Sequence, residues 1–107
     1  MIKNLPPIEK IKRLGYFDLF KLKKSLKSRL AERVRSLKDA EATSESLKTK
    51  LNPPKNALEY SDLALANGKV VEIKSEILVI NTFLDEVNKY LDPMLEQLKN
   101  AGQPGNN

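Results

Sequence analysis

Apolar residues recur along the C-terminal third of the chain at alternating intervals of three and four. The pattern continues unbroken through Val70, Ile73, Ile77, Ile80, Leu84, Val87, Leu91, Met94 and Leu98. Such a heptad pattern puts all its members on one side of an α-helix, which another helix must then cover. We therefore predict a long helix over about 70–100. Its interaction seam comprises Val70, Ile73, Ile77, Ile80, Phe83, Leu84, Val87 and Leu91, with Phe83 widening the apolar surface.

A second apolar stripe lies in the N-terminal half of the chain. It is formed by Leu19, Leu22, Leu26, Leu30, Val34 and Leu37, again three or four residues apart, and predicts a long helix over about 17–51. Asn52-Pro53-Pro54 ends this helix, because proline disfavours helix at the preceding residue and removes a backbone donor. The two stripes can then face each other in an antiparallel hairpin.

Two shorter helices complete the expected fold. Pro6-Pro7 followed by Ile8, Ile11 and Leu14 predicts a helix over about 7–14, with Gly15 as its C-cap. A capping pair, Asn56 and Glu59, predicts another over about 57–66.

Asn67-Gly68 is expected to end the second of these short helices as a turn. Asn-Gly also occurs in β-hairpins, which would make 70–73 a strand, but the heptad pattern favours helix there. Pro93 is expected to kink the last helix without ending it, since the heptad phase continues past it. The prediction is one all-α domain over 1–107 with a flexible tail over 101–107.

Positive charge is concentrated at one end of the sequence. Residues 1–38 hold 12 Lys/Arg and 3 Asp/Glu, whereas residues 39–107 hold 7 and 11. Five of the cations form a basic flank on the side of helix 17–51 away from its apolar stripe: Lys21, Lys24, Lys27, Arg35 and Lys38. Such a flank can attract an acidic protein, an acidic region of this chain or of a second copy, or the phosphates of nucleic acid.

A basic amphipathic segment typical of membrane-surface binding is also present, with Phe17, Leu19, Phe20, Leu22 and Leu26 against Lys21, Lys23, Lys24 and Lys27. The heptads need a partner, however, so we expect the stripe to pair with them instead. Tyr16, Phe17 and Phe20 are then expected to anchor the first short helix to the core. No apolar run is long enough to span a membrane.

Catalysis has few candidate groups in this sequence. The chain has 0 Cys and 0 His, its 4 Gly are scattered, and its acidic pairs, such as Glu72 with Glu76, lie off the seam. These features disfavour thiol, histidine and metal chemistry and phosphate-binding loops, so we expect no enzyme activity, metal or cofactor. Absence of cysteine fits a reducing cytoplasm.

The sequence therefore predicts a protein–protein interaction or assembly protein. The interaction seam would close a hairpin within the chain or join it to another chain, making a homo-oligomer or a complex. The basic flank would attract an acidic partner. The alternative function is nucleic-acid binding through helix 17–38.

Overall fold

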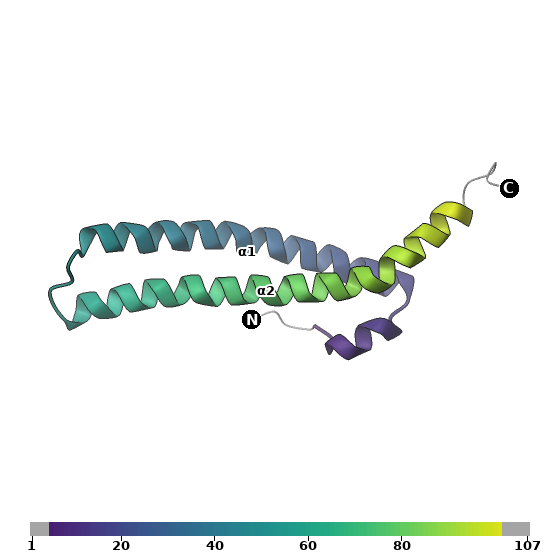
Figure 1. Ribbon diagram of the computed structural model, residues 1–107, viewed down its shortest axis with the longest axis horizontal. Helices are drawn as coiled ribbons and strands as arrows, with labels where there is room; N and C mark the ends of the chain where they lie inside the picture. Colours follow the sequence, from purple (N-terminus) through teal and green to yellow (C-terminus); the bar gives the residue numbers. More distant parts are fainter. Residues whose placement is uncertain (1–4, 102–107) are drawn as a thin grey trace. The chain divides into compact units, whose positions relative to one another are not determined.

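The computed structural model describes residues 5–101, which are mainly helical (Figure 1). They form a short 3-10 helix, η1 (Ile8–Arg13), and two long helices, α1 (Tyr16–Lys50) and α2 (Ala57–Ala101), without any strand in the described part of the chain. α1 and α2 pack against each other as a hairpin. The predicted all-α fold class and helical hairpin are therefore confirmed, and the strand alternative for 70–73 is excluded. Residues 102–107, most of the predicted tail, lie outside the described residues.

The connection between α1 and α2 follows the sequence signals closely. The Leu51 N–H still donates to the Leu47 carbonyl (2.8 Å), after which the two prolines end the helix, with a cis peptide between Asn52 and Pro53. The side-chain oxygen of Asn56 accepts a hydrogen bond from the Glu59 N–H (2.9 Å), and Glu59 Oε1 accepts one from the Lys55 N–H (2.8 Å). Both bonds satisfy backbone donors that a helix start leaves without partners, so α2 begins where the capping pair predicts.

The predicted boundary at Asn67-Gly68 is wrong, because α2 runs through it as one helix. Gly68 is helical, and no described glycine has a positive φ. Glycine inside a helix costs only about 1 kcal/mol relative to alanine. Apolar side chains that are buried or half-buried lie on both sides of it, among them Leu63 and Ile73, and their packing outweighs that cost.

Pro93 lies inside α2, as the continuing heptad phase predicts. Proline has no N–H to donate to the carbonyl four residues earlier, and its ring crowds that carbonyl. Figure 1 shows α2 bending in its C-terminal part. We attribute this bend to Pro93.

The first short helix forms, but as 3-10 rather than α-helix. Its carbonyls accept bonds from residues three positions later, from Lys10 N to Pro7 O (2.9 Å) and from Leu14 N to Ile11 O (3.1 Å). A constant three-residue spacing, as in Ile8, Ile11 and Leu14, keeps apolar side chains aligned only at the three-residue period of a 3-10 helix.

Gly15 is not the predicted left-handed C-cap. Its carbonyl instead accepts the first hydrogen bond of α1, from Leu19 N (3.0 Å). Leu14, which precedes it, is extended and ends η1. Gly15 therefore occupies the N-cap position of α1, where glycine is well tolerated.

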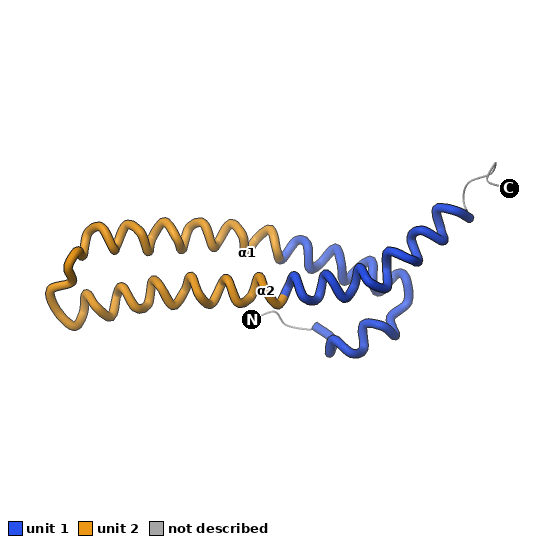
Figure 2. Tube along the Cα trace, in the orientation of Figure 1, with its two compact units in different colours: residues 1–29, 80–107 blue, residues 30–79 orange. Residues whose placement is uncertain are grey.

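The chain divides into two compact units, coloured separately in Figure 2. Unit 1 comprises Met1–Arg29 and Ile80–Asn107, and unit 2 comprises Leu30–Val79. Unit 1 contains most of the buried apolar side chains: Ile11, Leu19, Leu26, Ile80, Leu84, Val87 and Leu91. In unit 2 the buried side chains are Ile73 and the polar Ser44. The expectation of a single domain stays a prediction. Neither long helix, over the residues described, has a segment apolar enough to cross a membrane.

Candidate interaction surfaces

The interaction seam lies inside the hairpin in both units. In unit 1 its members Ile80, Leu84, Val87 and Leu91 are buried, and Phe83 is half-buried. In unit 2 Ile73 is buried, with Val70 and Ile77 half-buried. Of the two uses that the sequence leaves open, the structure shows the one within the chain.

The apolar stripe of α1 also turns inward. Leu19 and Leu26 are fully buried in unit 1, and Leu22 is half-buried there. In unit 2 Leu30 and Leu37 are only half-buried, and Val34 is 39% exposed. The stripe is thus covered least well in unit 2, whose described residues form only parts of α1 and α2 and their connection.

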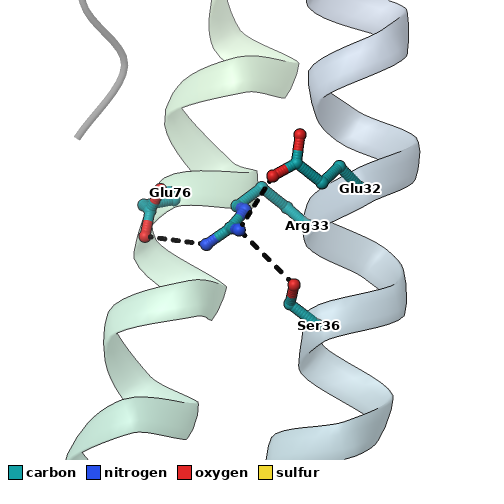
Figure 3. A network of polar contacts seen from close by, with 4 residues as sticks. All are labelled: Glu32, Arg33, Ser36 and Glu76. Atoms are coloured by element: carbon teal, nitrogen blue, oxygen red, sulfur yellow. Dashed lines mark hydrogen bonds and ion pairs between the residues drawn. The ribbon is translucent and has the colours of Figure 1, made fainter.

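A polar network joins the two helices in unit 2 (Figure 3). Arg33 projects from α1 toward Glu76 of α2, with Nη1 3.6 Å from Oε1. The same guanidinium also contacts Glu32 (3.2 Å) and donates to the Ser36 hydroxyl (3.4 Å). Glu76, which the sequence places off the seam, therefore has a partner on α1.

A second polar contact between the helices was not foreseen from the sequence. The Ser44 hydroxyl of α1 is buried and donates to the side-chain oxygen of Asn67 of α2 over 2.7 Å. The sequence predicts a turn at Asn67, and this prediction gave no reason to expect that its side chain would pair with Ser44 of α1. The available signal was a serine at a position where α1 otherwise faces α2 with apolar side chains.

The basic flank is exposed throughout its length. Lys21, Lys24 and Lys27 belong to unit 1, and Arg35 and Lys38 to unit 2. Within residues 5–101 the ion pairs involve other cations, namely Arg33, Lys74 and Lys89, so these five side chains remain available to an external anion. This arrangement matches the sequence placement of the flank opposite the apolar stripe.

Large apolar side chains are exposed along the part of α2 that belongs to unit 2. They are Leu58, Tyr60, Leu65, Val71, Leu78 and Val79, each between 46% and 71% exposed. We call these six residues the α2 outer face; they lie on both flanks of the helix, since Leu65 lines a groove with Thr43 and Leu47 whereas Val71 lines another with Glu41 and Glu45. The separate helix predicted for 57–66 hides that Leu58, Tyr60 and Leu65 lie on the same helix as the other three.

Phe17 and Phe20 are not part of the core, contrary to the prediction that they anchor η1 to it, and Tyr16 is half-buried. Phe17 is 74% exposed and Phe20 is 44% exposed, and both pack on Tyr16, with ring centroids 5.4 and 6.1 Å away. The buried side chain of η1 is Ile11 instead. The reason is geometric: the inward side of α1 in this region is set by Leu19 and Leu26, and Phe17 and Phe20 lie on the other side.

No cluster of three or more potential metal-ligating side chains occurs between residues 5 and 101. Searches against protein-family models, curated proteins and solved structures found no match. The fold places the chain in the class of all-α helical hairpins. Its exposed apolar and basic surfaces are the features that bear on its function.

Proposed function

We propose that this chain is a non-enzymatic protein–protein interaction protein that assembles with a second copy of itself. The observation that carries the proposal is the α2 outer face, six large exposed apolar side chains on one stretch of helix. Large apolar side chains that are open to water gain free energy when another apolar surface covers them. The interaction seam stabilises the hairpin, and the α2 outer face would contact the partner.

Unit 2 is suited to a partner because it lacks a third layer. In unit 1, η1 adds the buried Ile11 to the two long helices, whereas unit 2 consists of two helices and their connection. Two helices alone bury little apolar area, and a second hairpin packed against them would create a four-helix core.

The charges of unit 2 favour a second copy as that partner. Unit 2 contains eight Lys/Arg and eight Asp/Glu, so two copies meeting there would carry no net repulsion. Protein interfaces have an apolar centre and a polar rim, and the charged residues of unit 2 would form such a rim around the α2 outer face. The basic flank would contribute attraction to acidic groups of the partner.

Molar mass in solution tests this proposal. Light scattering on the intact chain should give a mass above 12.1 kDa, and Leu65→Glu should return it to the monomer value, because a charge buried in an apolar interface is strongly unfavourable. Leu65 is 71% exposed, so the variant should keep its helical content. Ser46→Glu, an exposed position on α1, adds the same charge and should leave the mass unchanged. A monomer mass for the native chain at every concentration would refute the proposal.

Nucleic-acid binding through helix 17–38 is the second candidate. It is supported by five exposed cations without ion-pair partners in the described chain. Replacing Lys24, Lys27 and Arg35 with Glu should abolish a gel shift at low salt, since affinity for phosphates depends on cation number. No shift with the native chain at low salt would exclude this function.

A further inference from the structure

We infer that unit 1 carries a docking site for a bilayer surface that contains anionic phospholipids. The site combines an aromatic patch with the nearest part of the basic flank. The aromatic patch consists of Tyr16, Phe17, Phe20, Met94 and Leu98, all in unit 1.

The patch is continuous and open to solvent. Phe17 is 74%, Phe20 44% and Leu98 53% exposed. Tyr16 links the two phenylalanines through ring contacts, and a shallow hollow lined by Tyr16, Phe17, Met94 and Leu98 joins α1 to the end of α2. Three large side chains that the hairpin leaves outside its own core therefore lie together.

Lysines surround this patch on the exposed side of α1. Phe17 and Lys21 are four residues apart, as are Phe20 and Lys24, so each pair lies on one helix face. Lys27 continues the same face one turn later, and all three lysines are exposed without an ion-pair partner in residues 5–101. Lysine stems can lie along apolar surface while their ammonium groups reach outward to phosphate.

The charge of unit 1 complements an anionic surface. Its described residues include ten Lys/Arg and six Asp/Glu. Two of these acids follow patch residues closely in sequence: Asp18 directly follows Phe17, and Glu96 lies two residues after Met94. An interfacial site needs apolar side chains that enter the headgroup region and cations that attract anionic lipid, and both are present here.

The composition of the patch favours lipid over nucleic acid as its occupant. Phe17 and Phe20 pack on Tyr16, and Met94 and Leu98 are aliphatic neighbours with no hydrogen-bonding role toward bases. Single-strand binding requires separate ring faces on which successive bases stack. Insertion of a contiguous apolar cluster into a bilayer has no such requirement.

Vesicle co-sedimentation of the full chain tests the site. The native chain should sediment with phosphatidylcholine–phosphatidylserine vesicles and remain in solution with phosphatidylcholine alone. The double variant Phe17→Ser/Phe20→Ser should bind at least about tenfold more weakly, since each ring loses its transfer into an apolar phase. Lys21→Gln and Lys24→Gln should each weaken binding about fivefold.

The control is Lys48→Gln/Lys50→Gln, which removes two exposed charges from the part of α1 that belongs to unit 2 and should sediment like the native chain. Far-ultraviolet circular dichroism checks that each variant keeps its helix content. Equal loss in the two double variants, or equal binding to neutral and anionic vesicles, would overturn the inference.

Tryptophan fluorescence provides a second measurement of insertion. The chain has 0 Trp, so Phe17→Trp places a single reporter in the patch. Its emission should shift to the blue on adding anionic vesicles, whereas that of Ser46→Trp, an exposed position in unit 2, should not. Absence of a shift at position 17 would show that the site does not bind lipid. The same conclusion would follow if the native chain did not sediment with vesicles but bound DNA in a gel shift, and Phe17→Ser/Phe20→Ser left that DNA binding unchanged.

Discussion

Unit 1 and unit 2 are built from the same two helices, yet they differ in how those helices are covered. Unit 1 has η1 beside the hairpin and buries seven large apolar side chains, whereas unit 2 buries Ile73 and Ser44. Unit 2 in turn exposes the six residues of the α2 outer face. Heptad spacing is thus enough to pair two helices, but a third element determines whether the pair encloses a well-buried core.

The largest expected difference between the units concerns core truncation. Leu26→Ala in unit 1 should lower the free energy of unfolding by about 2–5 kcal/mol, because it leaves a cavity in a fully covered site. Leu37→Ala in unit 2 should cost about 1–2 kcal/mol, because Leu37 is half-exposed already and the space can fill with water. Urea denaturation measures both values. Equal losses would contradict the difference in coverage between the units.

A smaller effect is expected from the helical glycine of unit 2. Gly68→Ala should raise the free energy of unfolding by about 0.5–1 kcal/mol, since alanine has the higher helix propensity and an added Cβ meets nothing within 4 Å. Gly15→Ala is the matched control in unit 1, also with open space around its Cβ. Gly15 is an N-cap, where alanine is disfavoured, so that variant should give no gain. A stabilising Gly15→Ala would mean that its N-cap assignment is wrong.

The smallest expected effect belongs to the ion pair of unit 2. Glu76→Gln should reduce the free energy of unfolding by less than about 1 kcal/mol, because the Arg33–Glu76 pair is partly exposed and spans 3.6 Å. Glu72→Gln, on an exposed residue of the same helix, is the control and should change stability less. A double-mutant cycle with Arg33→Gln isolates the pair energy. A coupling energy of zero would leave the polar network without a role in stability.

Helix pairing was predictable because it depends on regularities that extend over many residues. The seam from Val70 to Leu91 specified the inward side of α2, and Pro53-Pro54 with the Asn56 cap specified the connection. These signals act locally or repeat often enough to outweigh any single residue. The hairpin follows from them without knowledge of the tertiary structure.

Positions that depend on competition between local and tertiary effects were not predictable in the same way. Gly68 has the sequence signature of a helix end, but packing on both sides keeps it helical. Phe17 and Phe20 are apolar enough for a core, yet Leu19 and Leu26 already occupy the inward side of α1. Hydrophobicity alone does not identify which of several apolar neighbours will face inward.

The two exposed surfaces also differ in how far the sequence predicts them. Helical periodicity predicts that charged side chains on the far side of an apolar stripe face solvent, and the five side chains of the basic flank are exposed. Their role in binding a partner stays a prediction. The α2 outer face was missed, because the expected helix boundary at Asn67-Gly68 put its first three members on a separate short helix. Recognising it from sequence would have required recognising first that the helix beginning at Ala57 continues through Gly68.

The hydrogen bond between Ser44 and Asn67 has a consequence for alignment. Leucine and isoleucine side chains can pack in several registers of one helix along the other, so apolar contacts alone discriminate poorly among these registers. Sliding one helix by a single turn displaces its side chains by about 5.4 Å, which would separate this donor from its acceptor and leave a sequestered hydroxyl unsatisfied. One serine therefore gives the native register of α1 against α2 a lower free energy than registers shifted by one turn. It does so in unit 2, where little buried apolar surface is present to fix the register.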